Sequence, residues 1–183
     1  MLNRRTVAVL LALALTIPLT VDLAVSASPA EIDREVDFAL ARLFDSVPNA
    51  KPLSTQAKGV LVFPSIVKAG FLFGAQYGEG ALRRQGRTVG YYNTVAASYG
   101  FQAGIQSFGY ALFFMSDSAL RYLDTSGGFE LGTGPSLVIL DAGAARALTT
   151  TTMQNDIYAV FFDQRGLMGG AGVQGSKITR IAR

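Results

Sequence analysis

The residues best suited to chemistry in this sequence are basic, and three of them lie close together. Arg83, Arg84 and Arg87 flank Gln85 and Gly86, where we expect the turn of a β-hairpin. Guanidinium groups bind phosphate oxygens through paired hydrogen bonds, so the cluster suits phosphate-bearing ligands such as lipid headgroups. The alternative interpretation is a solvated loop with no ligand.

The sequence lacks the side chains on which most enzymes depend. Its 183 residues include no His, no Cys and no Trp, which excludes Ser-His-Asp and Cys-His catalysis, disulfides and Cys-based metal sites. Ser65 and Lys68 have the Ser-x-x-Lys spacing of penicillin-recognising enzymes, but the accompanying Ser-Asp-Asn and Lys-Thr-Gly elements are missing, so we interpret the spacing as chance. The carboxylates are scattered. We therefore expect no enzyme activity, no cofactor and no metal site.

Residues 1–27 have the pattern of a secretory signal peptide. Arg4 and Arg5 precede the apolar run Val7–Leu15, and small residues permit cleavage after Ala27. Pro18 interrupts the apolar segment before it reaches the ~20 residues of a membrane span, which disfavours a retained anchor. We expect an exported protein, periplasmic or associated with the cell envelope. With no Cys, it would have no lipoprotein anchor.

Residues 28–183 are expected to form a single domain of modest charge. Half of the chain is hydrophobic and 16% is charged, which is typical of a folded domain with a filled core. Loss of Arg4, Arg5 and Asp22 with the signal peptide reduces the net charge from +3 to +2. This charge is too small to indicate a nucleic-acid partner, and nothing in the pattern indicates an oligomeric state.

Helices come first in this domain. Ser28 and Glu31 are spaced as a capping box with Pro29 at the first helical position, so we expect a helix from there to just before Pro48. Its apolar residues recur at helical spacing: Ile32, Val36, Leu40, Leu43 and Val47. Acids outnumber bases on the other face, so we expect the stripe to pack on a sheet and not on a membrane. A second short helix is expected at 54–58.

In the rest of the domain, apolar residues recur at every second position, as they do in β-strands with one buried face. We expect strands at 60–63 (stopped by Pro64), 71–77, 87–92, 99–105, 110–115, 136–140, 157–162 and 171–174, with a short helix at 116–123 and an irregular or helical stretch at 142–148. The consecutive apolar residues at 113–115 and 161–162 predict a layer that is covered on both faces. The fold class is therefore α+β: N-terminal amphipathic helices packed on a strongly curved antiparallel sheet or partly closed β-barrel.

A Gly-apolar-Gln element recurs three times, at Gly74–Gln76, Gly104–Gln106 and Gly172–Gln174. Each copy gives its strand one apolar face and one face of Gly and Gln. Gly weakens the interior of a strand, so three copies suggest a bend toward barrel closure or the close approach of a helix or ligand. Tolerance of Gly in a curved sheet is the alternative.

Several segments, taken in order, resemble the SYLF domain, also called the Ysc84 actin-binding domain family. They are Ala57–Pro64, Gly70–Gly74, Gly100–Gln106, Ile157–Tyr158 and Arg165–Gly170. The resemblance spans about Ser28 to Ile181 and implies a non-catalytic lipid-binding domain, with actin binding in fungal members. It also implies roles in headgroup binding for Lys58 and Arg165, where the family places basic residues.

We therefore expect an exported domain that binds anionic phospholipids at a membrane surface. Arg83, Arg84 and Arg87 would meet the headgroups, and Lys58 and Arg165 would assist. The alternative is an interaction or structural module of the envelope with a protein partner. A third class, a small barrel of the outer membrane, fits the Gly-rich strands but not the capped N-terminal helix.

Overall fold

The computed structural model describes residues 27–125, 129–130, 135–140 and 154–183. Except for Ala27, the expected signal peptide lies outside these residues, as does the expected stretch at 142–148. The first element is α1 (Pro29–Ser46), which begins and ends where the sequence predicts. The Ser28 hydroxyl accepts a hydrogen bond from the Glu31 amide, and the Glu31 carboxylate accepts one from the Ser28 amide at 2.8 Å. The capping box is thus formed in full.

The next helix, α2 (Ala50–Gln56), is shifted from the prediction at 54–58. Pro52 lies in the first turn of α2. A proline is tolerated there because the first amides of a helix have no intrahelical acceptor. Gly59, which follows the predicted helix at 54–58 and is therefore expected to be its C-terminal cap, instead begins the first strand.

The sheet is built on three very long strands: β1 (Gly59–Arg84), β2 (Arg87–Phe114) and β5 (Ile157–Ile181). β2 lies between the other two and is antiparallel to both. The short strands β3 (Phe129–Glu130) and β4 (Leu137–Leu140) pair with β5, and β4 is parallel to it. The strands predicted as separate segments are therefore continuous. Pro64 does not end β1, because it lies where the register with β2 shifts in a β-bulge.

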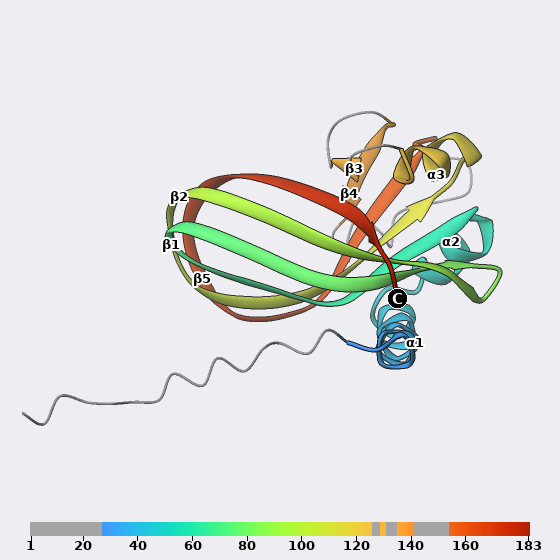
Figure 1. The fold of residues 1–183 in the computed structure, drawn as a ribbon, viewed down its shortest axis with the longest axis horizontal. Coiled ribbons are helices and arrows are strands. Elements are labelled where there is room, and N and C mark those ends of the chain that lie inside the picture. The colour runs from blue at the N-terminus through green and yellow to red at the C-terminus, as the bar shows by residue number, and fades with distance from the viewer. Residues whose placement is uncertain (1–26, 126–128, 131–134, 141–153) are drawn as a thin grey trace, which may run out of the picture.

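Each long strand turns back on itself, so that the sheet forms a half-barrel. In Figure 1 the three strands reverse together at the end away from α1, α2 and α3. The contacts across β1 agree, because a Cβ on Gly78 would lie 2.6 Å from Ile66 Cγ1 and one on Gly80 would overlap the Val62 carbonyl. Only glycine permits the two halves of β1 to approach this closely. The bend that the Gly-rich faces suggested is therefore present.

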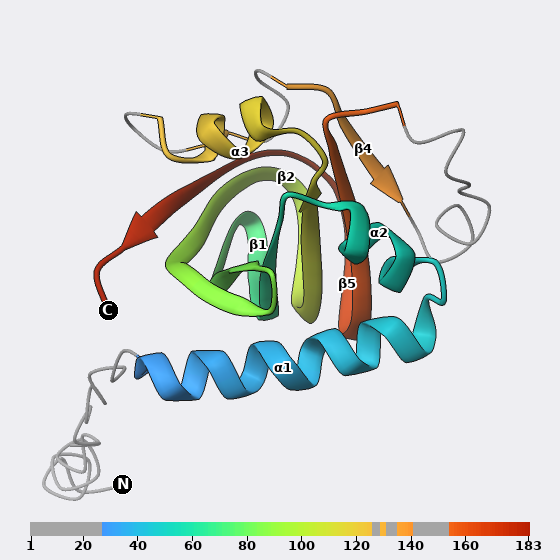
Figure 2. The same ribbon diagram turned by 90° about the vertical axis from the view of Figure 1, so that its right-hand side faces the viewer.

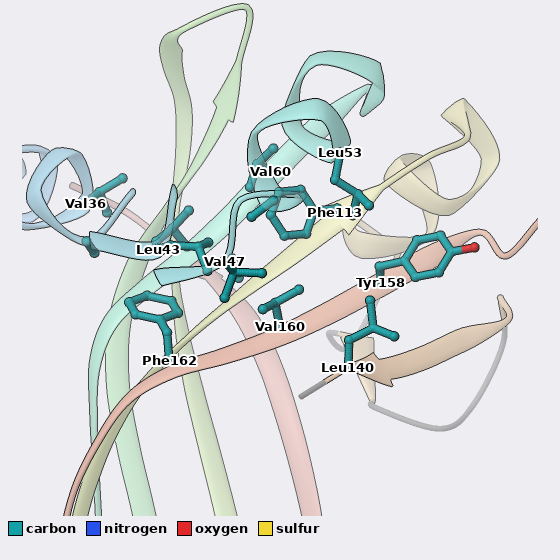
Figure 3. Close-up of a cluster of buried hydrophobic side chains, with 14 of the residues drawn as sticks. Val36, Leu43, Val47, Leu53, Val60, Phe113, Leu140, Tyr158, Val160 and Phe162 are labelled. Carbon is teal, nitrogen blue, oxygen red and sulfur yellow. The ribbon is translucent and has the colours of Figure 1, made fainter. Parts of the chain in front are cut away.

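Two hydrophobic cores stabilise this arrangement. One lies between the outer face of the sheet and the two N-terminal helices, and includes Val36, Leu43, Val60, Phe113 and Phe162 (Figure 3). The other fills the inside of the half-barrel. Figure 2 shows α1 across one side of the sheet and short helix α3 (Asp117–Leu123) on the other.

The second core contains residues from all three long strands and from α3, among them Phe63, Tyr110, Phe114, Leu120 and Ile157. Adjacent phenylalanines therefore serve different cores, and Phe113 and Phe114 are both fully buried. The prediction of an apolar layer covered on both faces is confirmed. The α+β fold class on a strongly curved sheet is confirmed as well, with the parallel pairing of β4 as a difference.

Candidate functional site

The predicted arginine cluster lies at the tip of the β1–β2 hairpin. Gln85 and Gly86 form its two-residue turn, and both have positive φ (51° and 75°), as a type I′ turn requires. Arg83 does not point to solvent. Its side chain is 13% exposed and donates to the Asp33 carbonyl at 3.0 Å and to the Asp37 carboxylate at 2.7 Å.

Asp33 on α1 holds the hairpin tip through further contacts. Its carboxylate accepts hydrogen bonds from Thr88 at 2.6 Å and Tyr91 at 3.1 Å, and it lies 3.7 Å from the Arg83 guanidinium. Partial burial and the hydrogen bond to Asp33 raise the pKa of Tyr91. Arg83 therefore belongs to a network that joins the hairpin to α1.

Three of the other residues predicted to bind headgroups, Lys58, Arg84 and Arg87, are exposed and lie close together. Arg84 donates from Nε to the Lys58 carbonyl at 3.2 Å, while Arg87 pairs with Arg84 in the strand register. A pocket of about 400 Å³ opens between the tip, α1 and α2, and its lining includes Arg83 and Asp37 but none of these three cations. We name Lys58, Arg84 and Arg87 the tip cluster.

Arg165, the fifth predicted residue, lies far from the tip cluster. It pairs with Ser107 on β2, near the end where the sheet turns back. Between Phe73 at this end and Arg84 at the tip, β1 runs eleven residues, which corresponds to roughly 35 Å. The structure thus joins Lys58, Arg84 and Arg87, assigns Arg83 to the α1 network and separates Arg165 from all four.

The turned-back end of the sheet exposes large apolar side chains. Phe71, Phe73, Ile105 and Leu167 are 75%, 70%, 66% and 88% exposed. Val67 and Leu72 are exposed beside them, and we name these six residues the apolar end. Leu72 has φ of 63°, a conformation that costs a leucine about 1–2 kcal/mol, so the bend holds backbone strain beside Phe71 and Phe73.

These side chains share one face because of the strand register. Ile105 lies opposite Leu167 on β5 and Ala69 on β1, and Phe71 follows Ala69 by two residues. The inner face carries Gly and polar residues instead, since Gln76 and Ser98 are buried. In the first two Gly-apolar-Gln copies, the middle residue faces solvent and the Gln side chain faces the inside of the half-barrel. The side chains of the third copy are not among those that the structure describes.

The surroundings of the apolar end are basic. The segments that form the bend, residues 66–77, 96–108 and 164–176, contain no Asp or Glu, and their charged residues are Lys68 and Arg165. Lys68 is half-buried on the inner side, opposite Gln106, whereas Arg165 is exposed on the outer side. The family resemblance singled out Arg165, but the sequence analysis did not single out the exposed apolar side chains beside it. The signal that was available is a run of alternating strands with almost no charge.

Among the described residues, no three acidic side chains come together in a way that could hold a metal ion. None of the helices that the structure describes is long and apolar enough to cross a membrane. The fold is a small α+β half-barrel with exposed basic side chains at the hairpin tip and exposed apolar side chains at the turned-back end.

A comparison with protein families identifies the domain. The family model Ysc84, described as Las17-binding protein actin regulator, matches residues 95–182, from the second part of β2 through β5. The matched segment, 88 of the 183 residues, therefore belongs to the Ysc84, or SYLF, family, as the resemblance predicts. The matched segment includes Ile105, Arg165 and Leu167 but none of the tip cluster. A search of the curated proteins gives no match.

Proposed function

We propose that this protein binds anionic phospholipids at a membrane surface and catalyses no reaction. The family is associated with actin or lipid binding. The observation that carries the choice of lipid is the apolar end, where Phe71, Phe73, Ile105 and Leu167 expose two-thirds or more of their surface on a convex end of the molecule. Contiguous exposed apolar surface of this kind marks an interaction site.

The charge and shape around the apolar end favour a lipid surface over a protein partner. A bend without acidic residues is not repelled by anionic headgroups, and Arg165 beside it can contact them. The end is convex and projects from the molecule, so it can insert into the interface, where apolar groups enter about 5–10 Å.

The expected affinity can be estimated from these side chains. Burying one Phe, Ile or Leu completely contributes about 1.5–3 kcal/mol, and each basic residue near an anionic surface contributes about 1 kcal/mol. Four side chains that are already two-thirds or more exposed therefore provide several kcal/mol. Binding should be measurable at micromolar lipid concentrations, which correspond to about 8 kcal/mol.

The tip cluster is the second position at which headgroups could bind. Lys58, Arg84 and Arg87 are exposed there, but they lie roughly 35 Å along β1 from the apolar end. One flat bilayer would contact one of the two ends. We place the membrane at the apolar end, because it offers apolar surface and a cation together.

Co-sedimentation with lipid vesicles tests the proposal. The protein should sediment with vesicles that contain phosphatidylglycerol, less with pure phosphatidylcholine, and less again as salt screens the charges. Absence of vesicle binding, together with stoichiometric capture of an envelope protein, would replace the proposal by the protein-interaction alternative. The exported location is part of the same proposal, and N-terminal sequencing of the protein from a periplasmic fraction should begin at Ser28.

A further inference from the structure

A small pocket lies on the outer face of the sheet between the apolar end and α1. It has a volume of about 190 Å³, and its lining includes Arg42, Ser65, Ser107, Asp163 and Arg165. Single waters occupy a few tens of Å³, so the space is larger than one water needs. We name it the bulge pocket, because irregularities of two strands form it.

The irregularities lie on both sides of β2. On β1, Pro64 and Ser65 lie opposite the single residue Gly109 of β2, so β1 has one extra residue between the register positions Phe63 and Ile66. On β5, Asp163 and Gln164 lie opposite the single residue Phe108 of β2 in the same way, so β5 also has one extra residue where the register shifts between Ser107 and Gly109. Bulges redirect side chains and often lie beside functional sites. Here the two bulges open the sheet at one level and direct polar groups to one place.

The bulge pocket gathers hydrogen-bond donors without protein partners. Within the part of the chain that the structure describes, the Arg165 guanidinium and the Ser65 and Ser107 hydroxyls have no hydrogen bond or ion pair. Arg42 pairs through Nε with Asp163, which leaves its other N–H groups available. Two arginines and one aspartate give the pocket a net charge of +1, which complements the single negative charge of a phosphodiester.

The backbone around Arg165 is fixed by close packing. Asp163 has φ of 52°, a conformation that Asp adopts more readily than most residues, and its carboxylate meets α1 through Arg42. Gly166 has φ of 89°, and a Cβ there would overlap the Ile105 carbonyl. The Asp163–Arg42 ion pair on one side and the close approach of Gly166 to β2 on the other position Arg165 relative to the apolar end.

The pocket lies at the depth where headgroup phosphates would be. Arg165 and Leu167 are two residues apart on β5, which corresponds to about 7 Å along the strand. The headgroup layer of one leaflet is about 5–7 Å thick, half the difference between the whole bilayer and its hydrocarbon core. If the strand enters along the membrane normal, Leu167 reaches the hydrocarbon boundary when Arg165 is among the phosphates.

We propose that the bulge pocket binds one phosphate group, with Arg165 and Arg42 as charged donors and Ser65 and Ser107 as hydroxyl donors. The inference rests on the proposed function, since it assigns the phosphate of an anionic lipid to this pocket. The same donor set would bind a free phosphate, so the test includes both sources.

The first arm of the test measures binding to phosphatidylglycerol vesicles. Arg165→Lys keeps the charge but loses the paired hydrogen bonds, and Ser107→Ala changes no charge. A phosphate held in the pocket predicts about tenfold weaker binding for each variant, since a hydrogen bond to a charged group is lost. Arg87→Gln at the tip is the matched control and should bind like the wild type. Wild-type binding by both pocket variants would overturn the pocket while leaving membrane binding intact.

The second arm measures the same variants with inorganic phosphate in place of vesicles, by NMR of the arginine side chains. If wild-type protein does not bind vesicles but binds phosphate, and loses it with Arg165→Lys, then the proposed membrane function fails and the pocket stands as a site for soluble phosphate. If the pocket variants change neither vesicle binding nor phosphate binding, the pocket proposal fails. Thermal unfolding of each variant confirms that it folds.

Discussion

Replacement of Ile105 by Ser tests whether the apolar end contacts lipid. Ile105 is 66% exposed on β2, and its register partners Ala69 and Leu167 are exposed as well. The substitution removes apolar surface that faces solvent in the free protein. The fold should therefore tolerate it, with a change in unfolding free energy of about 0.5–1 kcal/mol.

The effect on membrane binding should be larger than the effect on folding. Complete burial of an isoleucine side chain contributes about 1.5–3 kcal/mol, and about two-thirds of that remains available at Ile105. Loss of about 1–2 kcal/mol weakens binding about 5- to 30-fold. Titration of protein with phosphatidylglycerol vesicles, followed by co-sedimentation, measures this directly.

Ile139 provides a matched control. It is 64% exposed on β4, beside Ala159 and away from the bend. Ile139→Ser removes the same side chain at nearly the same exposure, so it should leave vesicle binding unchanged. Equal affinities for the Ile105→Ser and Ile139→Ser variants would refute the assignment of the apolar end as the membrane-binding surface.

Three further outcomes are expected. The double substitution Arg84→Gln/Arg87→Gln should change vesicle binding by less than about twofold, because the tip lies several screening lengths from the apolar end; a loss tenfold or greater would place the headgroups at the tip, as the sequence predicted. Leu43→Ala should lower the unfolding free energy by about 2–5 kcal/mol in denaturant titration, because the Leu43 side chain on α1 is fully buried against the sheet. A loss under 1 kcal/mol would mean that α1 is only loosely attached. Hydrogen bonds from two serine side chains lower the pKa of Asp156 below its ordinary 3.8. These contacts therefore stabilise the fold above that pH, and the stabilisation is lost as the pH falls through the lowered pKa. Asp156→Asn should flatten this acid dependence of the melting temperature, and an unchanged dependence would contradict the role of Asp156.

Local signals in the sequence predicted α1 and α3 well. The contacts that start α1 join Ser28 and Glu31, and those that cap α3 join Ser116 and the Ala119 amide, so both lie within one turn. Such contacts depend on the nearest residues and are readable without knowledge of the fold. The two-residue hairpin turn at Gln85 and Gly86 was predictable for the same reason.

The continuity of the long strands was harder to predict. In the sequence, Pro64 is a local signal that a strand ends. In the structure it lies in a β-bulge, where it does not have to donate a hydrogen bond to β2, and this bulge depends on how β1 pairs with β2. The same limit applies to Arg83. Three neighbouring arginines look like a solvated tip, and only the packing of α1 over the hairpin brings Asp33 and Asp37 to Arg83.

The apolar end shows what periodicity leaves open. Alternation gives the two faces of a strand but does not say which face is covered. At Phe71, Ile105 and Leu167 the apolar face is exposed, because the bend brings the inner faces close together and leaves room there for Gly and small polar groups. That outcome depends on the half-barrel as a whole.

The most direct test of the membrane proposal uses the absence of Trp from the sequence. Phe71→Trp places a unique fluorophore at the apolar end, where Phe71 is 75% exposed, and Ile139→Trp places one on β4 as a control. With phosphatidylglycerol vesicles, the emission of Trp at position 71 should shift to the blue and be quenched by brominated acyl chains, while the control stays unchanged. Sedimentation of the protein with the vesicles and no change at position 71 would contradict insertion by the apolar end.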